Sequence, residues 1–96
     1  MRVIWTPEAE ASHEENLDYL SHFWSNNVMQ RYFDALTFTI NTIAQHPESF
    51  PIHDSSKGIH KAVILEQLTL FYRVKRDTVF ILSLWDNRQD PDKLEI

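Results

Sequence analysis

The sequence predicts one α+β domain over residues 1–96, in which a helical hairpin packs on a small antiparallel sheet. Three observations support this prediction. A short β-type run opens the chain, two segments of helical period follow, and three β-rich runs with very short connections come last. The length suits one domain, and no repeat, linker or low-complexity tract divides it. The expected order of elements is therefore β-α-α-β-β-β.

The first expected strand covers residues 2–5 (RVIW), and a helix start follows it directly. Thr6 is suited to cap the helix, Pro7 to occupy its first position, and Glu8 to lie at the positive end of its dipole. One face of this first helix then carries residues spaced by i, i+4, i+7 and i+11, namely His13, Leu17, Leu20 and Trp24.

A second helix is predicted after a break at residues 25–27. Its apolar stripe has a clear 3.6-residue period. The stripe consists of Met29, Tyr32, Phe33, Leu36, Ile40 and Ile43. Pro47 disfavours helix at the residue before it, so we expect the helix to end near His46.

The C-terminal half predicts a three-stranded meander. Residues 47–58 have the composition of a loop, and the β-rich runs follow at 59–65, 68–74 and 78–85. The connections at 66–67 and 75–77 are short enough to require tight hairpins, although neither contains glycine. The last run is apolar on both faces, which is typical of a strand in the interior of its sheet.

Composition excludes several classes of protein. The chain has no cysteine, so it has no disulfides, thiolate metal sites or cysteine nucleophile. Its longest apolar runs, such as residues 62–65, are far too short to cross a bilayer, so we expect no membrane association. The opening residues contain no apolar segment of the signal-peptide kind, and a cytoplasmic protein is therefore expected.

The charge of the chain is distributed unevenly. A net charge of -5 argues against a general nucleic-acid binder. Residues 1–56 hold two basic and eight acidic side chains, whereas residues 57–96 hold seven basic and six acidic ones. The meander therefore carries most of the cationic groups, and a local patch of them would meet a phosphate or an acidic partner.

No cofactor or metal site is expected. The single glycine cannot build a phosphate-binding loop. The histidines show no HxxxH or HExxH spacing; they are His13, His22, His46, His53 and His60. His53 and Asp54 precede two serines, but adjacency in sequence is not the geometry of a catalytic triad, and a polar loop is the better interpretation.

Basic residues of the meander are the first candidate functional groups. His60 could supply an acid–base group, since its ordinary pKa lies near neutrality, and Lys61 could contact a phosphate. The alternatives are a surface histidine and a lysine at a sheet edge. Arg73 and Arg76 flank the second hairpin, where they either meet a target or simply form a solvated turn that discourages edge pairing.

A second candidate cluster is the WDNRQDP segment after the last run. Trp85 is a candidate contact, and Asn87 and Arg88 could present planar donors to a carboxylate or phosphate. Alternatively, Asp86 and Asn87 bond the backbone of a turn, and Asp90 pairs with Arg88. We favour a structural role for Asp86 and a functional role for Arg88.

The chain resembles toxins of the RelE/ParE superfamily in the order of six segments: VIWTPEAE, LDYLSHFW, PESFP, GIHKAVI, LFYRVKRDTVFILSLW and WDNRQDP. The resemblance covers nearly the whole chain. It implies the toxin of a type II toxin–antitoxin pair, in which a cognate antitoxin neutralises the toxin by wrapping it with an extended segment. A hetero-oligomer with that antitoxin is therefore expected.

Members of the superfamily divide by target. RelE-type toxins cut messenger RNA on the ribosome with lysines, arginines and a C-terminal Tyr or His, whereas ParE-type toxins poison DNA gyrase. Arg88 matches one family arginine, but Thr69 stands three residues before Tyr72, where a ribonuclease member has Arg. No Tyr or His follows Arg88. The resemblance therefore implies a ParE-like gyrase inhibitor that acts by binding rather than by catalysis.

Two alternatives stay open, a RelE-like ribosome-dependent mRNA endonuclease and a degenerate, non-toxic relative. An endonuclease would use His60, Lys61, Arg73 and Arg88 as its catalytic candidates. Contacts with the target or the antitoxin are expected from Lys61, Arg73, Arg76, Trp85, Asn87 and Arg88.

Overall fold

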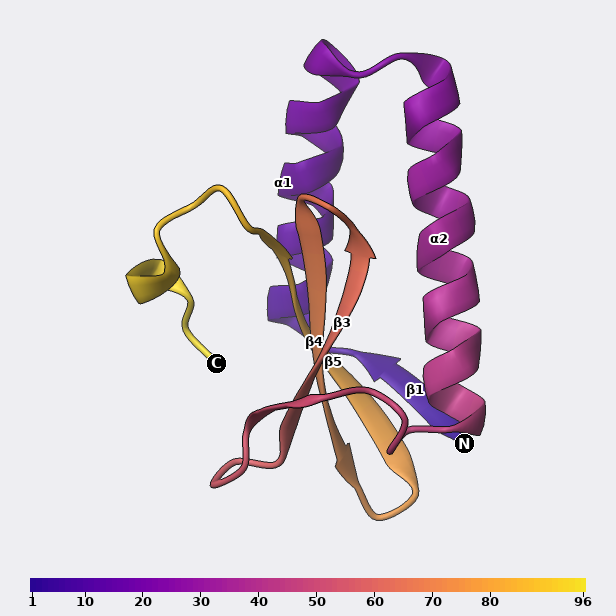
Figure 1. Cartoon of the computed structure of the whole chain (residues 1–96), viewed down its shortest axis with the longest axis vertical. Coiled ribbons are helices and arrows are strands. Elements are labelled where there is room, and N and C mark those ends of the chain that lie inside the picture. Colours follow the sequence, from indigo (N-terminus) through magenta and orange to yellow (C-terminus); the bar gives the residue numbers. More distant parts are fainter.

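The computed structural model describes residues 1–96 as two antiparallel helices packed on a five-stranded sheet (Figure 1). The elements are β1 (Arg2–Trp5), α1 (Pro7–Phe23), α2 (Asn26–Gln45), β2 (Ile52–Asp54), β3 (Ile59–Leu65), β4 (Leu68–Lys75), β5 (Thr78–Asp86) and the 3₁₀ helix η1 (Pro91–Lys93). The predicted α+β class and the predicted order of the main elements are confirmed. Neither α-helix combines the length and the apolar character that crossing a membrane requires.

The helix boundaries follow the local signals in the sequence. The Thr6 hydroxyl accepts a hydrogen bond of 3.1 Å from the backbone N–H of Ala9, so Thr6 caps α1 as predicted. Ser25 caps α2 in the same way by accepting from the N–H of Val28. The helix break consists of Trp24 and Ser25, so the break predicted at residues 25–27 is wrong for Asn26 and Asn27, which form the first turn of α2. α2 ends shortly before Pro47, as expected.

The sheet is larger than the predicted meander. Its strand order is β1-β5-β4-β3-β2, and β3, β4 and β5 form the expected antiparallel meander. β1 adds to it in parallel with β5, with Val3 opposite Val79, so the sheet is mixed. The α1–α2 hairpin provides the long crossover that a parallel pair requires.

Residues 47–58 were expected to form only a loop, and this is wrong for Ile52–Asp54, which pair with the start of β3 as strand β2. The backbone N–H of Lys61 also donates to the carbonyl oxygen of Pro51 at 3.0 Å. This short edge strand escapes sequence patterns because its pairing partner lies beyond the Gly58 turn, and local residues alone do not indicate it.

A β-bulge explains why the sequence of β5 has apolar residues at both odd-numbered and even-numbered positions. Phe71 of β4 lies opposite Ser83, but the next residue, Tyr72, lies opposite Ile81, so Leu82 is an extra residue in β5. The buried positions change parity across the bulge, from Val79 and Ile81 before it to Leu84 after it. As predicted, β5 is an interior strand, between β1 and β4.

The main hydrophobic core lies between the helices and one face of the sheet. Its buried members include Leu20 of α1, Tyr32, Leu36 and Ile43 of α2, and Leu68, Leu70, Tyr72, Val79, Ile81 and Leu84 of the sheet. Trp5 and Trp24 pack against this cluster. Phe33 was assigned to the core stripe of the second helix, but its side chain is 41% exposed, because it lies at the edge of the stripe.

The hairpin between β4 and β5 turns without glycine. Arg76 and Asp77 adopt positive φ angles of 52° and 60°, as the two central residues of a type I′ turn do. This backbone matches the right-handed twist of the two strands. The tight hairpin predicted at residues 75–77 is therefore confirmed.

Candidate functional site

One face of the sheet points away from the helices, and we call it the open face. Leu70 and Tyr72 of β4 point into the main core, so the alternate residues Thr69, Phe71 and Arg73 point to the open face. Residues paired across neighbouring strands lie on the same face. The strand register therefore places three rows there: Val63–Thr69–Trp85, Lys61–Phe71–Ser83 and Ile59–Arg73–Phe80.

Two hollows lie over this face. The first, which we call the Trp85 hollow, has a volume of about 280 Å³, and its lining includes Lys61, Thr69, Phe71, Trp85, Asn87 and Leu94. The second, the Arg73 hollow, has a volume of about 470 Å³, and its lining includes Lys57, Ile59, Arg73, Leu82, Glu95 and Ile96. Both are wide, shallow depressions, unlike the enclosed pockets that bury small-molecule ligands. They suit contact with an extended polymer segment.

Four of the predicted contact residues meet on the open face. Lys61, Trp85 and Asn87 line the Trp85 hollow, and Arg73 lines the neighbouring one. Neither Lys61 nor Arg73 forms an ion pair within the chain. Lys61 shares the Trp85 hollow with the aromatic side chains of Phe71 and Trp85. The face therefore combines unpaired cations with apolar surface, a combination suited to an acidic and partly apolar partner.

Asn87 has a structural as well as a positional role. Its side-chain oxygen accepts a hydrogen bond of 2.9 Å from the Thr69 hydroxyl, and its side-chain amide donates to the carbonyl oxygen of Glu66. The backbone N–H of Asn87 also donates to the carbonyl oxygen of Gln67 at 2.8 Å. Asn87 thus fastens the end of β5 to the β3–β4 turn while lining the Trp85 hollow.

Arg88 faces away from the open face. Its guanidinium donates to both carboxylate oxygens of Asp86, at 3.0 and 2.7 Å, and lies 5.3 Å from the centre of the Tyr19 ring on α1. The hydrogen bonds to Arg88 lower the pKa of Asp86. The expected partner of Arg88, Asp90, instead caps η1 by accepting from the N–H of Asp92. A bidentate carboxylate within the chain thus occupies the donors that were predicted to meet a target.

His60 lies on the opposite face from Lys61 and Arg73. Only 5% of its surface is exposed, its ring stacks on Tyr72 at 5.0 Å, and its Nδ1 atom lies 2.9 Å from the carbonyl oxygen of Phe50. Burial raises the pKa of Tyr72 to about 12, so its hydroxyl stays protonated and donates to the carbonyl oxygen of Pro47. His60 and Tyr72 together hold the segment before β2. These contacts describe a structural histidine rather than an acid–base group facing a substrate.

Arg76 lies at the tip of the β4–β5 turn, exposed and outside both hollows. Sequence reasoning missed three open-face residues: Ile59, Phe71 and His53. The sequence could have identified Phe71, because it lies two residues before Arg73 on β4 and therefore faces the same side of the sheet. His53 could not be found because its strand was not predicted; its ring packs edge-on against Phe71 at 4.7 Å.

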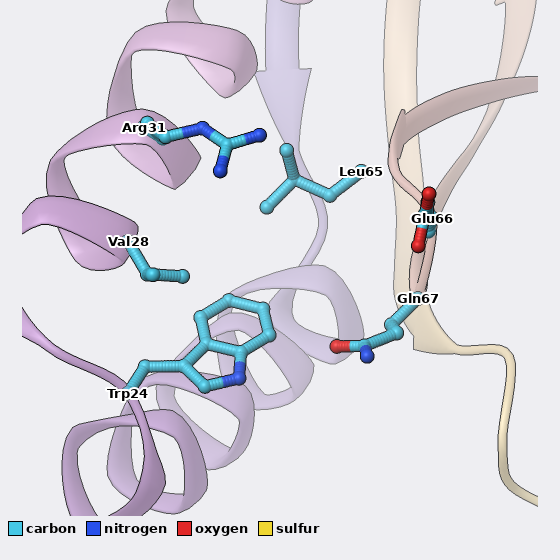
Figure 2. A pocket seen from close by; sticks show the side chains of 6 residues that line it. All are labelled: Trp24, Val28, Arg31, Leu65, Glu66 and Gln67. Carbon is cyan, nitrogen blue, oxygen red and sulfur yellow. The ribbon is translucent and has the colours of Figure 1, made fainter.

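A further groove lies between α2 and the β3–β4 hairpin. Figure 2 shows Trp24, Val28 and Leu65 with Arg31, Glu66 and Gln67 around it. Its apolar floor belongs to side chains that pack against the main core, and Arg31 and Glu66 are the only charged groups in its lining. The groove lacks the cluster of titratable groups that catalysis requires.

The mixed sheet, the helical hairpin and the cationic open face define a small α+β protein with a shallow, basic surface on its sheet. A family model described as "ParE toxin of type II toxin-antitoxin system, parDE" matches residues 3–91. The chain therefore belongs to the ParE toxin family, within the RelE/ParE superfamily that the sequence resembles. No curated protein sequence matches it.

Solved structures share this fold at low sequence identity. The chromosomal ParDE system of P. aeruginosa has 17% identity and a TM-score of 0.71, over 90% of this chain and 95% of that one. A YoeB/ParE toxin from Agrobacterium tumefaciens has 13% identity and a TM-score of 0.63, over 90% and 98%. The YoeB-YefM complex from Staphylococcus aureus has 18% identity and a TM-score of 0.58, over 88% and 94%. At these identities the likeness shows the fold alone.

Proposed function

We propose that the protein is a toxin that acts by binding, as a DNA gyrase inhibitor, and that an antitoxin neutralises it. The observation that carries this proposal is the composition of the open face. Lys61 and Arg73 lie there without ion-pair partners, and Lys61 shares the Trp85 hollow with Phe71 and Trp85. Membership of the ParE toxin family supports the gyrase as the target.

The placement of the other candidates disfavours the ribonuclease alternative. RNA cleavage without a metal needs an acid–base pair and cations around the same phosphate. His60 is buried on the opposite face, and Arg88 is bound to Asp86. Of the four catalytic candidates, only Lys61 and Arg73 lie on the open face. His53 lines the Trp85 hollow with Lys61, but that lining contains no Asp, Glu, Tyr or second His with which it could form an acid–base pair. An inhibitor without turnover requires no such set.

An antitoxin is the expected partner, in a hetero-oligomer with this chain. Two of the similar structures are named as pairs, the ParDE system and the YoeB-YefM complex. The shallow hollows of the open face match an extended segment of such a partner better than they match a small molecule. Contact through Lys61, Arg73, Trp85 and Asn87 would cover the cations that we assign to the target.

The test is induction of this chain alone in a bacterium that carries a DNA-damage reporter. We expect growth arrest with the reporter on, and inhibition of gyrase supercoiling by the purified protein. The double variant Lys61→Ala, Arg73→Ala should lose both effects while staying folded. The variant Arg2→Ala, Arg31→Ala removes the same charge from exposed positions of β1 and α2 and should keep both effects.

Other outcomes of this experiment point to the alternatives. Arrest with a silent reporter and intact supercoiling would contradict gyrase inhibition and support cleavage of messenger RNA. Normal growth at a verified level of folded protein would identify a non-toxic relative.

A further inference from the structure

The open face contains two deeply buried apolar residues that the main core does not account for. Ile59 is 1% exposed and Phe71 is 4% exposed, although both point away from the helices. Neither belongs to the main hydrophobic cluster. The outer face of a sheet that has helices on one side only is normally solvated. Something other than the helices must therefore cover this part of the sheet.

Residues 90–96, which we call the C-terminal segment, lie over this part of the sheet, where the His53 ring also packs against Phe71 at 4.7 Å. Figure 1 shows the segment on the side of the sheet opposite α2. Leu94 lines the Trp85 hollow together with Phe71, and Ile96 lines the Arg73 hollow together with Ile59. The ammonium group of Lys57 donates to the carbonyl oxygen of Ile96 at 2.9 Å.

The segment matches the face in both polarity and charge. Leu94 and Ile96 are half-buried and alternate with the exposed Glu95, so the apolar side chains meet the sheet and the carboxylate faces its rim. Glu95 shares the Arg73 hollow with Lys57 and Arg73. Asp90 and Asp92 lie earlier in the segment and line neither hollow. The stretch Leu94–Ile96 after η1, in which apolar and acidic residues alternate, therefore occupies a face that carries apolar groups and cations.

We infer that the C-terminal segment is a detachable cover of the open face, and that the surface beneath it binds an extended partner segment of the same chemistry, apolar and acidic in alternation. A protein segment of this kind binds only after the cover has left. Its apparent affinity is thus reduced by the fraction of chains that are open. The inference rests on the proposed function only in taking the open face as the binding surface.

The test uses the full chain and a fluorescein-labelled peptide with the sequence of residues 89–96 as the probe. Leu94→Ser with Ile96→Ser should open the face, because it removes both apolar contacts of the segment without adding negative charge beside Lys57 and Arg73. We expect the opened chain to bind the peptide about tenfold more tightly than the wild type does, as measured by fluorescence anisotropy. Adding Arg73→Ala to the opened chain should weaken that binding.

A second variant that should release the C-terminal segment keeps the test valid if the first variant misfolds. Glu95→Lys keeps both apolar contacts and reverses only the charge beside Lys57 and Arg73, so it should also tighten peptide binding. Asp92→Lys makes the same change at a position of the segment that lines neither hollow, and it should behave like the wild type. Circular dichroism confirms the fold of each variant.

Two results would overturn the inference: equal peptide binding by the wild-type and opened chains, or no binding by either opened variant. Both can be read without any measurement of growth or of gyrase. Failure of the cover is therefore distinguishable from failure of the proposed function.

Discussion

The side-chain amide of Asn16 on α1 donates a hydrogen bond of 2.8 Å to the backbone carbonyl oxygen of Leu84 in β5. One turn earlier on the same helix, the hydroxyl of Ser12 accepts a hydrogen bond of 3.0 Å from the backbone N–H of Leu84. β1 pairs with β5 only as far as Ile81, so two side chains of α1 satisfy the strand edge beyond that point. The helix thus completes the sheet where β1 ends.

Asn16→Ala should lower the free energy of unfolding by about 1–3 kcal/mol, because it leaves a buried carbonyl without a donor. Chemical denaturation measures this loss. Glu15→Ala, at the exposed neighbouring position, is the matched control and should change stability by no more than about 0.5 kcal/mol. Equal stabilities of the two variants would contradict a structural role for the Asn16–Leu84 bond.

The Asp86–Arg88 pair predicts a loss of stability in acid. The hydrogen bonds from Arg88 depress the pKa of Asp86 in the folded chain. The contribution of the Asp86–Arg88 pair to the free energy of unfolding is therefore fully present above a pH of about 4, the pKa of Asp in the unfolded chain. It is lost as the pH falls through the lower pKa that Asp86 has in the folded chain. Asp86→Asn should cost about 1 kcal/mol at pH 7, since Arg88 is half exposed and solvent screens the pair.

Denaturation curves recorded from pH 7 to about pH 2 check this prediction, since they pass through the unfolded pKa of about 4 and continue below it. The difference in stability between Asp86→Asn and the wild type should shrink as the pH falls. A difference that stays constant over the whole range would contradict the ionic origin of the contribution.

His13 predicts a second pH dependence, nearer neutrality. Its Nδ1 atom lies 2.7 Å from the hydroxyl oxygen of Tyr32, and burial lowers its pKa. Because the unfolded chain takes up a proton more readily, stability should be full above a pH of about 6.5 and decline as the pH falls below it. His13→Asn keeps a polar group near the Nδ1 position and should flatten this decline.

Thermal denaturation at pH 7.5, 6.5 and 5.5, values that bracket the ordinary histidine pKa of roughly 6.5, measures the effect. His22→Asn is the matched control because His22 is exposed and bonds only to the backbone of its own helix. If the His22 variant flattened the profile equally, His13 would not be the responsible group.

His60→Ala should destabilise the chain by about 2–3 kcal/mol, because it removes a buried ring from the stack on Tyr72 and leaves the Phe50 carbonyl without its partner. Growth arrest per folded molecule should stay at the wild-type level. Comparison of arrest with the amount of folded protein in the cell checks this. Loss of arrest with unchanged stability would instead make His60 a catalytic group.

Local signals in the sequence determined much of the fold. Thr6, Ser25 and Pro47 set the helix ends, since capping and the constraint of proline act within a few residues. The spacing of the β-rich runs determined the meander and its two hairpins. Alternation along β4 also placed Arg73 on the face that carries Phe71, opposite Tyr72.

Only the tertiary structure decided which candidate residues act together. The parallel pairing of β1, the bulge at Leu82 and the short strand β2 depend on partners far away in the chain. Long-range contacts likewise buried His60 against Tyr72 and brought the Arg88 guanidinium over the Tyr19 ring. Packing between distant segments also places Ile96 in one hollow with Ile59 and Leu94 in the other with Phe71. Residue type and spacing identify a group that can bind or react, whereas packing between distant segments determines whether it faces a partner.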